Sequence, residues 1–135
     1  MYKNILVAVD GSDNNKPAVR TAVNMAVESG AKLTAVYVEN VGYRMAPNVA
    51  MVNDPLVNAE SVFEFIKAES QARCLKVEYK VVIGHPGESI ADMTSDYDLV
   101  ICGSLGRSGL KKAVLGSVSE MITRFAECPV LIVRK

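Results

Sequence analysis

Five short runs rich in apolar residues recur along the chain, and segments with helical spacing separate them. A short apolar run between turn signals is typical of a strand buried on both faces of a parallel sheet. Strands that alternate with helices form parallel βαβ units with right-handed crossovers. The sequence therefore predicts an α/β fold, with one doubly wound five-stranded parallel sheet and helices on both faces. The predicted strands are Ile5–Val9, Leu33–Val38, Lys76–Ile83, Leu99–Cys102 and Val130–Val133.

The helical segments between the strands have recognisable starts and stops. Pro17 falls in the first turn of the first helix, which Gly30 ends. A second helix begins near Ala59, with a periodicity that weakens after Ala68, and a third spans Glu88–Ser95. These segments are long enough to serve as the crossovers of the sheet.

The last helix opens with a predicted capping box, Ser117-Val118-Ser119-Glu120, and ends at Cys128-Pro129. Its expected apolar face consists of Val118, Met121, Ile122 and Phe125. Before the second helix, Glu39–Asn58 is an irregular stretch longer than connections usually run. It is either a lid or partner surface, or a loop folded on its own apolar side chains, and both interpretations stay open.

Length and charge limit what the chain can be. Its 135 residues, half of them apolar, make one domain over residues 1–135 with a conventional core. The 15 basic and 15 acidic residues cancel, so we expect neither nucleic acid nor a membrane surface as a partner. Met1–Asp10 lacks the architecture of a signal peptide or a membrane span, which predicts a cytoplasmic protein.

The cysteines and the single histidine give no sign of a metal centre. Cys74, Cys102 and Cys128 are odd in number and lack the spacing of metal ligands, so we expect no disulfide framework and no metal site. We interpret the cysteines as small buried apolar residues in a reducing compartment. His85, in the turn after the third strand, is interpreted as solvated.

Two loops are suited to binding a ligand. In open α/β sheets, ligands bind beyond the carboxyl ends of the strands, where the strand order reverses. Val9–Ser12 follows the first strand, and the glycine-rich segment Gly103–Gly109 follows the fourth. If these strands are neighbours at the reversal, the two loops face each other across one crevice.

The start of the last helix is suited to an anion. A helix N-terminus leaves N–H groups unpaired and carries partial positive charge, and glycines let the backbone approach phosphate oxygens. The Ser117 and Ser119 hydroxyls would add donors. Taken singly, Gly103, Gly106, Ser117 or Asp10 has an ordinary structural role in a turn or cap. Together, Gly103-x2-Gly106-x9-Gly116-Ser117 joins a strand end to a helix start and favours phosphate binding.

This spacing resembles the nucleotide-binding signature of the universal stress protein family, G-x2-G-x9-G-[S/T]. The segments Asn4–Ser12, Gly116–Glu120 and Cys128–Arg134 are similar to that family as well. The likeness spans the whole chain and is weakest between Glu39 and Leu75. It implies the strand order 3-2-1-4-5 and, because the glycine signature is intact, a member that binds ATP, with ADP or AMP as other ligands and Mg²⁺ held by the phosphates.

The resemblance also implies roles for individual residues. Asp10 would accept hydrogen bonds from the ribose or stand near the adenine. The main chain at Ala8, Val9 and Val38 would meet the base, Gly103 and Gly106 would flank the ribose and phosphates, Gly116, Ser117, Val118 and Ser119 would hold the phosphates, and Arg107 is a further candidate for phosphate contact. Leu105 stands where the family often has a polar or basic residue, which removes one side-chain contact. Gly87–Asp98 also looks shorter than the family's third helix.

Binding with slow or no hydrolysis is expected, because the phosphate loop contains no histidine or carboxylate to position water. The favoured function is a nucleotide-binding regulatory or stress-response module without catalytic residues. One alternative is a nucleotide-dependent enzyme, although Val9–Asp13 lacks the clustered serines and glycines of such loops. Another is an interaction module that binds no nucleotide, which Leu105 keeps open.

The C-terminal strand predicts self-association. Val130–Val133 would be an edge strand, apolar and without proline or lysine to block pairing. Antiparallel pairing with a second copy would build a two-fold homodimer, as the resemblance also implies.

Overall fold

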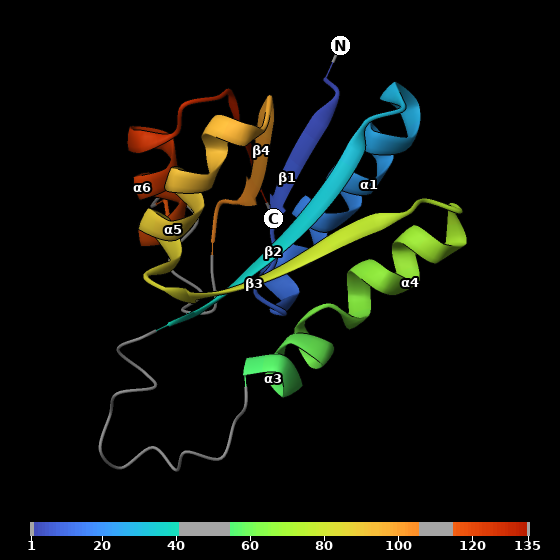
Figure 1. The fold of residues 1–135 in the computed structure, drawn as a ribbon, viewed down its shortest axis with the longest axis horizontal. Coiled ribbons are helices and arrows are strands. Elements are labelled where there is room, and N and C mark those ends of the chain that lie inside the picture. Colours follow the sequence, from blue (N-terminus) through green and yellow to red (C-terminus); the bar gives the residue numbers. More distant parts are fainter. Residues whose placement is uncertain (1, 41–54, 106–114, 135) are drawn as a thin grey trace.

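The computed structural model describes residues 2–40, 55–105 and 115–134, with the backbone alone for 55–58. They form a five-stranded parallel sheet in the order β3-β2-β1-β4-β5, with helices packed against it (Figure 1). The predicted fold class and strand order are confirmed. The strands are β1 Asn4–Ala8, β2 Lys32–Asn40, β3 Val77–Gly84, β4 Leu99–Gly103 and β5 Val130–Val133.

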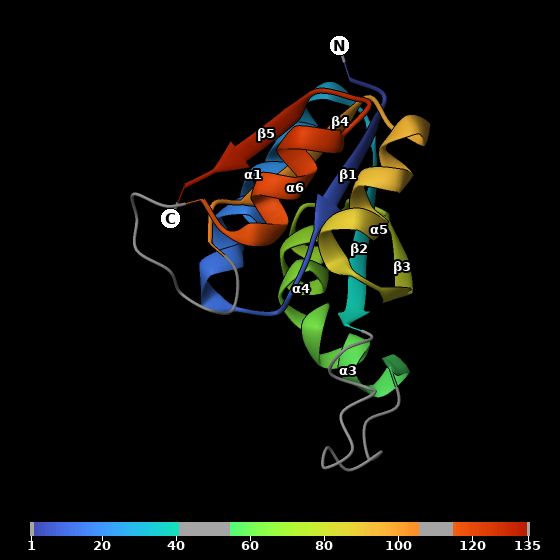
Figure 2. The same ribbon diagram turned by 90° about the vertical axis from the view of Figure 1, so that its left-hand side faces the viewer.

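The helices divide between the two faces of the sheet, as Figures 1 and 2 show. Alternate residues of a strand point to opposite faces. Accordingly, Ile5 of β1 belongs to the core beneath α1 and α4, while Leu6 belongs to the core beneath α5 and α6. The helices are α1 Lys16–Ser29, α3 Pro55–Val62, α4 Glu64–Ala72, α5 Pro86–Met93 and α6 Ser117–Phe125, with short 3-10 turns at Asp13–Asn15 and Thr94–Asp96.

The prediction of one middle helix was wrong, because α3 and α4 are separate helices with Phe63 between them. The Phe63 ring is buried and makes an edge contact with Tyr37, at 6.5 Å between centroids, and a tilted contact with Tyr79, at 4.9 Å. The helical pattern weakens after Ala68 because a polar residue, Ser70, occupies the next inward position of α4.

Two helix starts differ from the expectation. His85 is the N-cap of α5, where its Nδ1 accepts the Glu88 N–H at 3.4 Å, so this helix begins two residues early at Pro86. Gly116, not Ser117, is the N-cap of α6, so the predicted capping box does not form. The Ser119 hydroxyl donates instead to the Gly103 carbonyl.

Three other predictions for side chains and segments are corrected. Phe125 is 60% exposed, because it lies in the last turn of α6. Cys102 is buried, but Cys74 is exposed in the turn before β3, where its φ is 54°, and Cys128 is half-buried. The first and last residues of the predicted irregular stretch Glu39–Asn58 belong to β2 and α3. The rest of it, 41–54, lies outside the described residues, as does any lid there.

Among the residues that the structure describes, no helix is long and apolar enough to span a bilayer.

Candidate functional site

A cavity of about 620 Å³ lies at the carboxyl ends of β1, β2 and β4. The strand order reverses between β1 and β4, so the cavity lies at the predicted reversal point. Gly106 and Arg107 lie outside the described residues. The structure brings nine of the predicted site residues together in its lining: Ala8, Val9, Asp10, Val38, Gly103, Gly116, Ser117, Val118 and Ser119.

One wall of the cavity is the carboxyl end of β2, which extends beyond the end of β1. β1 ends at Ala8, opposite Val36, and the Val9 N–H donates to the Val36 carbonyl at 2.9 Å. β2 continues to Asn40, and among the described residues no strand pairs with Val38 on the β1 side. The N–H and C=O of one strand residue point to the same side, and those of alternate residues point the same way. The peptide groups of Val38 therefore face the cavity.

Asn15 holds the end of β1, and the sequence analysis missed it. Its Nδ2 donates to the Ala8 carbonyl at 2.9 Å, and its Oδ1 accepts the Asp10 N–H at 3.2 Å. The residue is 5% exposed. The β1–β4 ladder extends to the pair Val7–Ile101, so the Asn15 amide takes the place of β4 beside the end of β1.

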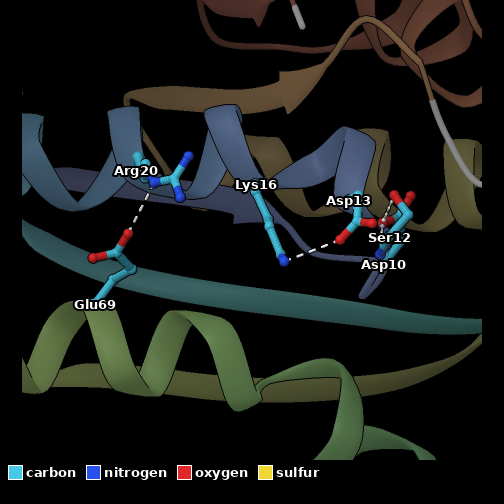
Figure 3. A network of polar contacts seen from close by, with 6 residues as sticks. All are labelled: Asp10, Ser12, Asp13, Lys16, Arg20 and Glu69. Atoms are coloured by element: carbon cyan, nitrogen blue, oxygen red, sulfur yellow. Dashed lines mark hydrogen bonds and ion pairs between the residues drawn. The ribbon is translucent and has the colours of Figure 1, made fainter.

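Asp10 is held in a tight turn (Figure 3). Its Oδ1 accepts hydrogen bonds from the Ser12 N–H at 2.8 Å and the Ser12 hydroxyl at 2.7 Å. Gly11 has a φ of +80°, and a Cβ there would lie 3.3 Å from the Cα of Val62 in α3. Only a glycine fits this left-handed, closely packed position without strain. The turn therefore fixes the direction of the Asp10 carboxylate at the cavity wall.

The start of α6 forms the opposite wall. The Gly116 N–H donates to the Ser104 carbonyl, and the Glu120 N–H donates to the Gly116 carbonyl, both at 2.8 Å. The N–H groups of Ser117, Val118 and Ser119 therefore have no acceptor inside the helix, and they lie at the positive end of its dipole. Because the Ser119 hydroxyl donates to the Gly103 carbonyl, this helix start is tied to the end of β4.

Two apolar residues also line the cavity near β4, and the sequence analysis did not count Cys102 among the site residues. Cys102, at the end of β4, is buried beside Ser119, and this burial raises the pKa of its thiol to about 11. Leu105, which stands where the resemblance leads one to expect a polar or basic residue, is buried and lines the cavity. Both residues make the wall near β4 more apolar than its glycines alone suggest.

A buried pair, Tyr37 and Glu39, lines the cavity at the end of β2 and was not predicted. The Tyr37 hydroxyl donates to Oε2 of Glu39. Sequence reasoning placed Glu39 in a loop, because an acid after an apolar run reads as the end of a strand. The sequence did contain a signal, because Tyr37 and Glu39 alternate with Val36 and Val38, a pattern typical of a strand that continues to Glu39.

The fold and the site define an α/β protein with a ligand cavity at its strand-order reversal. The chain belongs to the universal stress protein family, whose match covers residues 1–134. It is 34% identical over 148 residues to the universal stress protein MJ0531 of Methanocaldococcus jannaschii, covering 100% of this chain and 84% of the relative.

Two solved structures are similar along nearly their whole length. The structure of the hypothetical protein MJ0577 has a TM-score of 0.85 and 28% identity, covering 100% of this chain and 97% of the other. A universal stress protein in complex with cAMP has a TM-score of 0.71 and 27% identity, covering 98% of this chain and 97% of the other. That complex therefore holds an adenine nucleotide on the same fold.

Proposed function

We propose that this chain binds an adenine nucleotide, foremost ATP, in the cavity at the strand-order reversal, and acts as a regulatory stress-response module. One observation carries the proposal: a single cavity joins the N–H groups at the start of α6 to the backbone of β2 at Val38. The two walls have the chemistry of the two ends of a nucleotide.

The phosphates are assigned to the start of α6. The N–H groups of Ser117, Val118 and Ser119 point outward along the helix axis and form the positive end of its dipole. Each hydrogen bond to a charged oxygen contributes about 1.5–3 kcal/mol. Three such bonds contribute about 4.5–9 kcal/mol to the binding of a polyphosphate, before the costs of association are subtracted.

The base is assigned to β2. The N–H and C=O of Val38 present one donor and one acceptor side by side, which matches the ring nitrogen and the amino group on one edge of adenine. The cAMP complex of a relative at 27% identity supports an adenine ligand. Asp10, between the two walls, is the candidate to accept hydrogen bonds from the ribose.

Slow or absent hydrolysis is part of the proposal. The carboxylates among the described lining residues are Asp10 and Glu39, which stand at the ends of β1 and β2 rather than at the start of α6. The described lining groups at that helix start are N–H groups and the Ser117 hydroxyl, which suit phosphate oxygens, and no lining carboxylate lies there to hold a cation. Mg²⁺ would therefore arrive with the phosphates and be held by them.

Calorimetric titration with ATP, ADP and AMP tests the proposal, with Gly116→Val as the variant. Gly116 has φ −61° and ψ 154°, an extended conformation that any residue adopts, so valine adds bulk at the phosphate wall without backbone strain. We expect micromolar binding of ATP, and at least a tenfold loss in the variant that is larger for ATP than for AMP. Absence of heat with the unaltered protein would refute nucleotide binding, and an unchanged affinity in the variant would place the phosphates elsewhere.

Homodimer formation is proposed as well. β5 pairs with β4 and forms one edge of the sheet, and its four apolar residues are half-buried. An apolar edge strand with free backbone groups is a template for antiparallel pairing with a second copy. The observation that supports the dimer is therefore an edge strand that pairs only with β4 among the described residues, and a matched pair of proline variants tests it below.

A further inference from the structure

Glu39 is a buried acid that lines the cavity. This residue is 4% exposed at the carboxyl end of β2, and its Oε2 accepts a hydrogen bond from the Tyr37 hydroxyl. Removing a carboxylate from water is costly, and well-packed apolar residues in such places are often neutral or stabilising by comparison. A buried acid that also lines a cavity is therefore a candidate for ligand recognition.

The position of Glu39 along the cavity follows from strand register. Val36 lies opposite Ala8, and Val7 lies opposite Ile101, so Glu39 is two residues beyond the level of Gly103 and two strands away from it. These steps correspond to about 7 Å along the strands and about 10 Å across them, or about 12 Å in total. Gly103 accepts the Ser119 hydroxyl at the start of α6.

A separation of this size distinguishes the parts of a nucleotide. The ribose is attached directly to the first phosphate, so it lies much closer to the phosphate wall than Glu39 does. The outer edge of the base is the part of the ligand that reaches the end of β2. Val38, whose peptide groups face the cavity, is the neighbour of Glu39 in the chain.

We infer that the Glu39 carboxylate, positioned by Tyr37, accepts a hydrogen bond from the 6-amino group of the bound purine and selects a 6-aminopurine. This inference rests on the proposed function and names a specificity-determining residue for it. An amino group has two hydrogens, so one can meet the Val38 carbonyl while the other meets Glu39. A purine without that group leaves the buried acceptor without its ligand donor, and such losses reduce affinity strongly.

Tyr37 contributes by orienting the carboxylate. Its hydroxyl donates to Oε2, and its ring is held by the edge contact with Phe63. An oriented acceptor binds its donor without first losing side-chain freedom, so removal of the hydroxyl weakens selection while the acceptor remains. Tyr37 is therefore a positioning residue, and Glu39 is the residue that contacts the ligand.

The test is a titration with ATP and with purine riboside 5′-triphosphate, which lacks the 6-amino group and is otherwise the same. The unaltered protein should prefer ATP about tenfold to a hundredfold, the effect of one charge-assisted hydrogen bond. Glu39→Met should lower that preference to less than threefold while leaving the affinity for purine riboside triphosphate nearly unchanged. Tyr37→Phe should give an intermediate preference, and Glu28→Met, an exposed residue of α1, should match the unaltered protein.

The outcomes separate this inference from the proposed function. If the unaltered protein binds neither triphosphate, nucleotide binding itself is refuted. If it binds both equally, or if Glu39→Met keeps the full preference for ATP, the role of Glu39 is overturned and nucleotide binding stands. Should Glu39→Met fail to fold, the preference for ATP over purine riboside triphosphate is compared between the unaltered protein and Tyr37→Phe. An equal preference in the two proteins would overturn the inference, and a lower preference in Tyr37→Phe supports it.

Discussion

Asn15 completes the hydrogen bonding of Ala8: its Nδ2 donates to the Ala8 carbonyl at 2.9 Å, on the side of β1 from which β4 has diverged. The same amide accepts the Asp10 N–H at 3.2 Å. A side-chain amide has the donor and acceptor of a peptide group, so Asn15 substitutes for one residue of a strand. The strands β1 and β4 can therefore separate at the cavity without exposing an unsatisfied backbone.

Asn15→Leu should destabilise the protein. The substitution keeps the bulk but leaves the Ala8 carbonyl and the Asp10 N–H without their partner, at about 1–3 kcal/mol for each buried group. Urea unfolding followed by circular dichroism measures the loss. Asn24→Ala is the control, because the exposed Asn24 accepts from Arg73 Nη1 at the surface and should change stability by less than about 0.5 kcal/mol. Equal losses in the two variants would contradict the role of Asn15.

Gly87→Ala should weaken the packing of α5 on α6. A Cβ at Gly87 would lie 2.9 Å from the Cβ of Met121, which cannot move without shifting a helix. Overpacking of this kind costs about 1–3 kcal/mol. Gly84→Ala is the matched control, since its new Cβ would meet the Ser89 hydroxyl at 2.6 Å, an atom that can rotate away. A loss in Gly84→Ala as large as that in Gly87→Ala would argue against a rigid contact.

The three thiols should react in order of exposure. Cys74 is exposed, Cys128 is half-buried with its pKa raised chiefly by burial, and Cys102 is buried with a pKa of about 11. Because the thiolate is the reactive form, labelling at pH 8 should modify Cys74 first and Cys102 only when the protein unfolds. Mass spectrometry of labelled peptides over time identifies the order. Early labelling of Cys102 would show that the cavity wall opens readily.

The raised pKa of Cys102 predicts a loss of stability at alkaline pH. Its folded pKa of about 11 exceeds the ordinary value of 9.0, so the unfolded chain releases this proton first as the pH rises. The contribution of the protonated Cys102 thiol to the free energy of unfolding is complete below pH 9 and is lost between about pH 9 and pH 11. Comparison of the unfolding free energy of the unaltered protein with that of Cys102→Ala isolates it from other groups. Parallel curves for both proteins over this range would refute the assignment.

Ile132→Pro should dissociate the proposed homodimer. The carbonyls of Pro129 and Val133 accept hydrogen bonds from the N–H groups of Val100 and Ser104, so alternate residues of β5 face β4 and Ile132 presents its N–H outward. Proline removes only that outward donor from the ladder. Sedimentation should show a dimer for the unaltered protein at tens of micromolar and a monomer for the variant.

Leu131→Pro is the contrasting substitution, because Leu131 faces β4 within the same subunit. It should reduce the stability of the fold itself, as circular dichroism would report. A monomeric unaltered protein, or a dimer that survives Ile132→Pro intact, would exclude pairing through β5.

Most of the fold was predictable because short apolar runs mark strands that are buried on both faces. Leu6 and Val100 are fully buried within runs of this kind, and the observed strands differ from the predicted ones by only a residue or two at each end. The strand order relied on the family resemblance, since apolar runs do not say which strands are neighbours. The break at Phe63 could not be predicted, because it reflects contacts with rings from β2 and β3.

The site was predictable where function depends on local sequence. Gly103 ends β4 and Gly116 precedes α6, and both positions can be predicted from the neighbouring residues. Asn15 and Glu39 were missed because their roles depend on partners elsewhere in the chain. Asn15 follows Asp13 and Asn14 in a polar turn, so it looks exposed to solvent. Glu39 follows an apolar strand, so it looks like the start of a loop. Only the folded chain shows that both side chains are buried.

The early end of β1 gives the edge of β2 a further property. Beside Val38, the sheet has no neighbouring strand on the β1 side among the described residues, and Asp10 and α3 border this position. A molecule that enters it meets peptide groups, whose donors and acceptors are the same whatever side chains the strand carries. Substitutions along β2 can therefore retune the preference for one ligand over another while the basic capacity to dock a flat, hydrogen-bonding ring persists in the backbone.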